Sequence, residues 1–215
     1  MAYRQTPSVE ARLQDKRVRI LVAARSLVSE GGWAETQVAS VAASAGMATG
    51  SVYRYFSSKA ELFVEVLSAV SQREVDVLLE IAHSDESALA RLHTAVSSFV
   101  RRAMRSPRLA YALIAEPCDK EIDEARLRYR AAISEVVRSI IAAGQASGQM
   151  RSDVRHDVAA TMIVGGFMEG LIGPLSPLNR QPQSAADSYQ HEVALLADQI
   201  AKLACASVAL SPATP

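Results

Sequence analysis

The spacing of apolar and polar residues predicts helices along almost the whole chain of 215 residues. Apolar positions recur at i, i+3, i+4 and i+7, the repeat of an amphipathic helix, and no run alternates with the period of two that a strand requires. Gly31-Gly32, Ser106-Pro107 and Pro117 separate successive helical runs. We therefore predict an all-α protein of about nine helices, near residues 10–29, 38–45, 48–56, 59–83, 86–105, 107–116, 119–148, 153–172 and 189–206, with a proline-rich loop over 173–184.

Two short helices and a third, capped one are predicted between Thr36 and Leu62. Thr36 stands where its hydroxyl could accept the backbone N–H of Ala39 and cap the first of them. Gly46 offers the left-handed conformation that a sharp turn between helices needs, and Met47 is placed to fill the angle between the two helices. The spacing indicates a helix-turn-helix unit.

The second short helix, over residues 48–56, has an unusual surface. Val52 and Phe56 form its apolar face, whereas the remaining positions carry hydroxyls, one guanidinium and a small Gly50. It lacks the Glu/Lys pairs of an ordinary solvated helix. Hydroxyl and guanidinium groups beside a closely approachable backbone are what docking into the major groove of DNA requires.

Ser58 and Glu61 form an S-x-x-E capping box, which predicts that the next helix begins at Lys59. The free amide end of that helix carries partial positive charge and suits a phosphate. Trp33 is expected to fill the apolar seam behind the first helix. Three basic residues at the start of that helix could contact phosphates or form an ordinary solvated face: Lys16, Arg17 and Arg19.

The chain resembles the N-terminal domain of the tetracycline-repressor (TetR) family of bacterial transcription regulators. The resemblance covers about a quarter of the chain and rests on these residues: Ile20, Leu21, Ala23, Ala24, Leu27, Gly31, Thr36, Val41, Ala42, Ala45, Gly46, Met47, Gly50, Ser51, Val52, Tyr53, Phe56, Lys59 and Leu62. It implies a DNA-binding domain over 1–57, a helical ligand-binding and dimerisation domain over 58–210, and a tail over 211–215. It also implies a homodimeric repressor that binds a palindromic DNA operator and is released by a small-molecule ligand.

The matching positions of the family imply that Thr49, Tyr53, Tyr55 and Lys59 contact phosphates. Ser51 and Arg54 are better placed to read base edges, and Arg54 could bind a guanine through two hydrogen bonds. The full set of candidate DNA-binding residues is Thr36, Thr49, Gly50, Ser51, Tyr53, Arg54, Tyr55 and Lys59.

The rest of the chain resembles the family only in its helical pattern, so its site residues are less defined. The candidates for a ligand pocket are Phe99, Tyr111, Glu116, Arg126, Arg130, Met162 and Phe167, with Cys118 as a further polar contact. The family's four-helix dimer interface points to residues of the last two helices: Gly165, Gly166, Met168, Leu196 and Ile200. For the apolar residues in both sets, an ordinary place in the core is the alternative.

Charge is unevenly distributed although the formal net charge is zero. Residues 1–60 contain eight Lys/Arg and four Asp/Glu, whereas residues 61–215 contain 15 Lys/Arg and 19 Asp/Glu. The basic part coincides with the predicted helix-turn-helix unit, which favours a nucleic-acid partner for that part.

The composition argues against an enzyme and against a metal or cofactor site. The four histidines are dispersed without metal-ligand spacing, and phosphate-binding glycine loops and nucleophile elbows are absent. With two cysteines, no leader-like segment and no run expected to span a bilayer, a cytoplasmic protein without a membrane partner is predicted. The alternative function is a helical protein–protein scaffold, which would have no need for the basic and hydroxyl-rich segment from Tyr53 to Lys59.

Overall fold

The computed structural model describes residues 7–179 and 186–210. Within these ranges the chain forms nine α-helices, one short 3-10 helix and no strand: α1 (Pro7–Glu35), α2 (Val38–Ser44), α3 (Thr49–Val52), α4 (Lys59–Ala82), α5 (Ala88–Arg105), α6 (Pro107–Ile114), α7 (Lys120–Ala146), α8 (His156–Leu175), η1 (Pro177–Asn179) and α9 (Ala186–Ala206). The predicted all-α fold is confirmed. The predicted tail over 211–215 lies outside the described residues.

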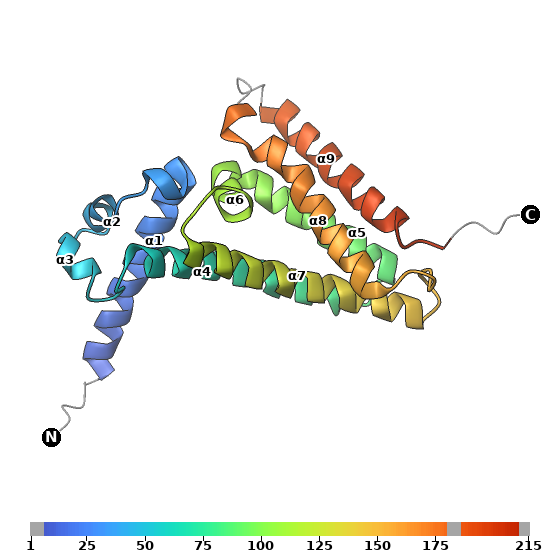
Figure 1. Cartoon of the computed structure of the whole chain (residues 1–215), viewed down its shortest axis with the longest axis horizontal. Helices are drawn as coiled ribbons and strands as arrows, with labels where there is room; N and C mark the ends of the chain where they lie inside the picture. The colour runs from blue at the N-terminus through green and yellow to red at the C-terminus, as the bar shows by residue number, and fades with distance from the viewer. Residues whose placement is uncertain (1–6, 180–185, 211–215) are drawn as a thin grey trace, which may run out of the picture.

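The helices form two packed parts that share α4 (Figure 1). Helices α1–α3 lie at one end, α4 leads from them into the body alongside α7, and α8 and α9 lie on the far flank. The buried apolar residues correspondingly fall into two clusters, but the N-terminal cluster also includes residues of α6 and α7: Leu109, Ala112, Ile122 and Ala125. The boundary at residue 57 thus stays a prediction, and packing crosses it.

Helix α1 is longer than predicted and contains a break where the sequence suggested an end. Gly32 has φ 78° and ψ −167°, a conformation almost restricted to glycine, and a last helical turn follows it to Glu35. The break redirects the chain so that Trp33, 3% exposed, packs in the core against Phe63 at 5.2 Å between ring centroids. The core role predicted for Trp33 is confirmed.

Helix α3 is shorter than the predicted 48–56, because helical structure ends at Val52 and a turn follows. Both residues of the predicted apolar face are buried, Val52 and Phe56 each at 1% exposure. The N–H groups of Tyr55 and Phe56 both bond the carbonyl of Val52, at 2.9 and 3.1 Å, so the chain folds back over the helix end. The turn buries Phe56 and lets α4 begin two residues after Ser57.

Helix α8 is apolar on both faces. We predicted that no run is apolar enough to span a bilayer, and this is wrong for α8. Its 20 residues, with a mean hydropathy of 1.5, are long and apolar enough to cross a membrane by length and composition alone. One face packs in the core through Ile163, Phe167 and Leu171, among others. The helix also continues to Leu175, past the predicted end at residue 172, because Pro174 in the last turn removes only one helical hydrogen bond.

Candidate nucleic-acid interface and ligand cavity

The turn between α2 and α3 has the geometry that the sequence predicted. Gly46 adopts φ 68°, and the N–H of Met47 bonds the carbonyl of Ala42 at 3.0 Å. Arg19, a candidate for phosphate contact, instead donates from Nη2 to the carbonyl of Ala45 at 2.5 Å. A guanidinium from α1 therefore fixes the turn.

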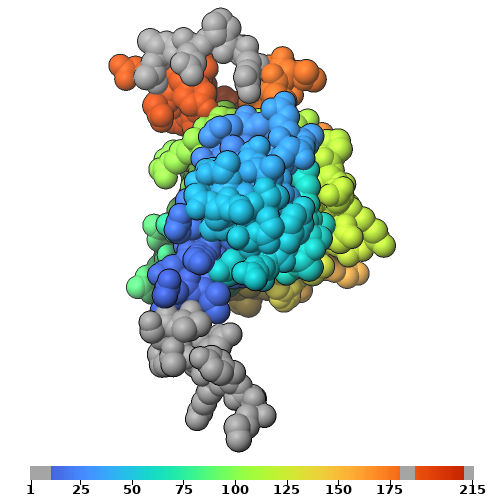
Figure 2. Space-filling view, turned by 90° about the vertical axis from the view of Figure 1, so that its left-hand side faces the viewer, coloured from blue at the N-terminus to red at the C-terminus, as the bar shows by residue number. Residues whose placement is uncertain are grey.

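The surface of α3 and the following turn is open (Figure 2). Thr49, Gly50 and Arg54 are exposed, and Tyr53 is 50% exposed. No described atom lies within 4 Å of the position that a Cβ on Gly50 would occupy, apart from its own surroundings in the chain. Ser51, Tyr55 and Lys59 are half-buried at the edges of this surface.

The same segment contains no acidic residue between Glu35 and Glu61. Arg54 and Lys59 are the charged side chains within it, so no carboxylate of the segment opposes a phosphate. Lys59 lies beside the start of α4, with its Nζ 5.2 Å from the ring centroid of Phe63. The surface combines exposed hydroxyls, backbone and positive charge.

Thr36 does not have the predicted role. Its side chain is 3% exposed and donates from Oγ1 to the carbonyl of Gly32 at 2.6 Å, whereas α2 begins after Gln37 without a side-chain cap. The break in α1 frees that carbonyl one turn before Thr36, and the hydroxyl bonds it. Thr36 is therefore a buried structural residue and not a surface contact to DNA.

The cap of α4 is confirmed, with one change of partner. Ser58 Oγ accepts the N–H of Glu61 at 3.0 Å, but the Glu61 carboxylate returns to the N–H of Ser57 at 2.6 Å and not to that of Ser58. Hydrogen bonds from the Ser57 hydroxyl and backbone lower the pKa of Glu61 below its ordinary value. The first turn of α4 is fixed directly beside the α3 surface.

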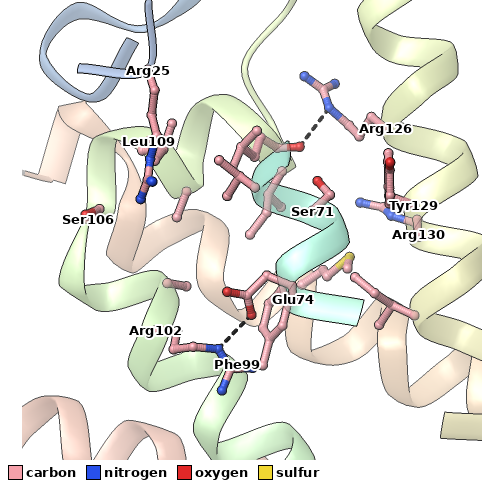
Figure 3. A pocket seen from close by; sticks show the side chains of 17 residues that line it. Arg25, Ser71, Glu74, Phe99, Arg102, Ser106, Leu109, Arg126, Tyr129 and Arg130 are labelled. Atoms are coloured by element: carbon pink, nitrogen blue, oxygen red, sulfur yellow. Dashed lines mark hydrogen bonds and ion pairs between the residues drawn. The ribbon is translucent and has the colours of Figure 1, made fainter. Parts of the chain in front are cut away.

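The body contains a cavity of about 150 Å³ between α4, α5, α6 and α7 (Figure 3). Phe99, Arg126 and Arg130 of the predicted ligand set line it. Arg25 of α1 and Met168 of α8 reach it as well. Side chains from six helices thus converge here, including α1 and α4 of the N-terminal part.

Four residues of the predicted ligand set do not line this cavity. Met162 is 71% exposed on the outer face of α8, and Phe167 is buried against Phe99 with ring centroids 5.0 Å apart. Tyr111 lies beneath the guanidinium of Arg108, at 5.9 Å from its ring centroid, and Glu116 is buried in an ion pair with Arg108. Periodicity placed Met162, Phe167 and Tyr111 on helices but did not show which side of each helix faces the cavity.

The N-terminal segment decides the family. Residues 20–66 match the family model described as "Bacterial regulatory proteins, tetR family". This segment is therefore a TetR-family N-terminal domain. Among curated relatives, the HTH-type transcriptional repressor KstR of Mycobacterium tuberculosis is 30% identical over 155 residues, covering 66% of this chain and 64% of the relative. The match covers 49% of the KstR of Mycolicibacterium smegmatis, at 36% identity over 106 residues and 46% of this chain.

Solved structures of other regulators share the fold over nearly their whole length. FadR from Bacillus halodurans has a TM-score of 0.74 at 18% identity, covering 94% of this chain and 97% of that one. FadR from Bacillus subtilis, in complex with stearoyl-CoA, has a TM-score of 0.73 at 18% identity, covering 87% and 97%. This chain therefore shares its overall helical fold with these regulators.

An ion pair joins the two parts of the protein near the end of α1. Arg108 of α6 bonds Glu116 through both terminal nitrogens, at 2.8 and 2.9 Å, and also donates to the carbonyl of Gly31 at 2.6 Å. Glu116 accepts the N–H of Trp33 at 3.2 Å, and Trp33 Nε1 donates to the carbonyl of Ala112 at 2.7 Å. The hydrogen bond to Glu116 raises the pKa of Arg108 above its ordinary value. We call this set of contacts between Arg108, Glu116 and the backbone of Gly31 and Trp33 the α1–α6 junction. The sequence did not predict it.

Arg126 has a structural role although it lines the cavity. Its Nε donates to the carbonyl of Leu113 at 3.0 Å, and its Nη2 donates to the carbonyls of Ala112 and Glu116 at 3.2 and 2.7 Å. Its Nη1 bonds Asp123 at 3.0 Å. The guanidinium thus caps the end of α6 and has little capacity left for a ligand.

The predicted dimer set divides between the surface and the core. Gly165 and Gly166 are exposed, and a Cβ on either would meet no described atom within 4 Å. Met168 is 6% exposed and lines the cavity, so its assignment to an outer face is wrong. Leu196 and Ile200 are half-buried against the core. The large apolar residues that α8 and α9 do expose are Val158, Met162, Leu195 and Leu203.

Proposed function

We propose that the protein is a transcriptional repressor that binds a palindromic DNA operator as a homodimer and is released from it by a small-molecule ligand. The observation that carries the proposal is the open α3 surface, where exposed hydroxyls, Gly50 and Arg54 project from a segment without carboxylates. Buried Val52 and Phe56 hold that surface at a fixed angle. Family membership supports a regulator and argues against an enzyme.

A bacterial regulator of this kind acts on DNA in the cytoplasm, and we propose that compartment. Helix α8 is then a helix of the protein's own bundle and not a membrane span. The cavity is the proposed ligand site because α4, which supplies Val70, Ser71 and Glu74 to it, begins beside the DNA-facing surface. A ligand can release the operator only to the extent that it binds the non-DNA-binding arrangement more tightly.

Replacing Arg54 with methionine is expected to relax sequence preference, because an arginine paired with a guanine contributes about 1–3 kcal/mol of discrimination between bases. Tyr53→Phe is expected to weaken the operator and random DNA to a similar extent, since a phosphate contact carries no sequence information. The measurement is binding of wild type and both variants to a duplex selected from a random pool and to unselected duplex, over a series of salt concentrations.

The salt series separates this proposal from the scaffold alternative. Phosphate contacts make the binding constant fall steeply as salt rises, with a slope proportional to the number of contacts. A scaffold with no DNA role would retain no duplex from the pool. If Arg54→Met and Tyr53→Phe shift specific and unspecific binding equally, the assignment of base reading to Arg54 is wrong.

The outer face of α8 and α9 is the proposed dimer interface. Val158, Met162 and Gly166 recur at intervals of four along α8, and Leu195 lies exposed on neighbouring α9. A helix that is apolar on all sides is normally covered on all sides, and a second copy would cover this face. Two copies would also supply the two reading units that a palindromic operator needs.

Gly166→Trp is expected to convert the dimer into monomers at micromolar concentration, because the new side chain would stand in the space of the partner helix. Light scattering measures the mass. Leu127→Trp is the matched control and should leave the mass unchanged, because Leu127 is 56% exposed and belongs to α7, which is not part of the proposed interface. If the Gly166→Trp protein remains dimeric, Gly166 does not lie in the dimer interface.

A further inference from the structure

The cavity between α4 and α7 has a strongly cationic lining for its size. Four arginines line it, Arg25, Arg102, Arg126 and Arg130, against the single carboxylate of Glu74. Arg102 pairs with Glu74, with Nε 2.8 Å from Oε2, and Arg126 is bonded to backbone carbonyls and to Asp123. Positive charge in excess of these pairings is therefore left at Arg130, which is half-buried, and at Arg25, which is exposed to solvent.

Two of the four arginines each have one buried guanidinium nitrogen without a hydrogen-bond partner among the described residues: Nη2 of Arg102 and Nε of Arg130. Figure 3 shows Arg130 reaching in from α7, beside Tyr129, on the side opposite Arg102. A buried donor on a charged group that lacks a partner is costly. Arg130 is the stronger of the two anchors because Arg102 already shares its charge with Glu74.

The remainder of the lining is mostly apolar, including Phe99, Ile133 and Met168. A cavity of about 150 Å³ is comparable with one that holds a single benzene ring. It accordingly has room for an apolar group of about six carbons. A cation would be repelled by the excess of arginines, and a purely apolar ligand would leave the guanidinium of Arg130 without an acceptor.

We infer that the effector is a small organic acid whose carboxylate binds Arg130 and whose apolar body packs against Phe99, Ile133 and Met168. This inference rests on the proposed function, because it names the ligand class of the same regulator. A carboxylate supplies two acceptor oxygens and a full negative charge, and charge-assisted hydrogen bonds of this kind are about twice as strong as neutral ones. In a coenzyme A thioester of the same acid, a neutral carbonyl replaces the carboxylate next to the apolar body, and the negative charge lies on the distant phosphates.

The test compares three acids with their neutral amides and coenzyme A thioesters by calorimetry on the full-length protein without DNA. The acids are cyclohexanecarboxylate, benzoate and octanoate. At least one acid is expected to bind ten- to a hundredfold more tightly than its amide. Arg130→Met should remove that difference, and Arg130→Lys should keep part of it. Arg128→Met is the matched control, since Arg128 lies exposed on the same helix and does not line the cavity.

Each outcome has a distinct meaning. If no acid binds better than its amide, or if a thioester binds more tightly than its acid, the inference is overturned. The comparison of acid and amide on the wild type holds even if a variant fails to fold. Operator binding is measured separately without any acid, so a failure there counts against the proposed function while the calorimetric result still decides the ligand class.

Discussion

Gly32→Ala is expected to lower the free energy of unfolding by about 4 kcal/mol. At φ 78° and ψ −167° an alanine is strained by about 1–3 kcal/mol. The new Cβ would also lie 1.7 Å from Arg108 Nη2 and 2.4 Å from Glu116 Oε2, so the ion pair must move. Urea denaturation followed by circular dichroism measures the loss, which corresponds to a fall in Tm of roughly 10 °C.

Gly148→Ala separates the two causes. Gly148 also has a positive φ of 70°, but a Cβ there would meet no described atom within 4 Å. Its substitution should cost only the conformational strain, about 1 kcal/mol. Equal losses for the two variants would show that contact with the Arg108–Glu116 pair adds nothing, contrary to the steric argument.

Features that depend on neighbouring residues in the chain could be predicted from the sequence. The turn at Gly46 and the cap of α4 at Ser58 follow from groups within a few residues of each other, and both are present. The break at Gly32 was similarly marked by Gly31-Gly32. Thr36 is the exception, because the break created a competing acceptor one turn back, and the hydroxyl bonds Gly32 in place of capping α2.

Features that depend on which face of a helix meets another helix could not be predicted. Helix α8 is apolar on both faces, so its pattern does not distinguish core from surface. Our prediction from the sequence placed Met162 in the ligand pocket and Met168 in the dimer interface, whereas Met162 is exposed and Met168 is buried. The cavity depends on Arg25, Glu74 and Arg102, which come from three helices and have no local pattern in common. Hydrogen bonds between residues far apart in the sequence, such as that from the Trp33 N–H to Glu116, cannot be predicted from hydrophobic periodicity.

Single substitutions in the α1–α6 junction are expected to destabilise the protein far more than substitution of both Arg108 and Glu116. Arg108→Met leaves the Glu116 carboxylate buried at 9% side-chain exposure without its partner, and Glu116→Met leaves Arg108 unpaired at 17%. Breaking one member of a buried pair costs about 3–5 kcal/mol, whereas replacing both by apolar groups costs far less. The double variant should therefore unfold at a higher urea concentration than either single variant.

The double variant also tests how a ligand in the cavity reaches the DNA-binding part. Leu109, Leu113 and Ile114 of α6 line the cavity, while Arg108 and Glu116 at the two ends of the same segment hold the backbone of Gly31 and Trp33. A ligand that displaces α6 would pull on α1 through this pair. We expect Arg108→Met/Glu116→Met to bind operator like wild type without ligand but to need at least tenfold more ligand for release, measured by fluorescence anisotropy of labelled operator. Unaltered release in the folded double variant would exclude this connection and leave α4 as the path between cavity and DNA.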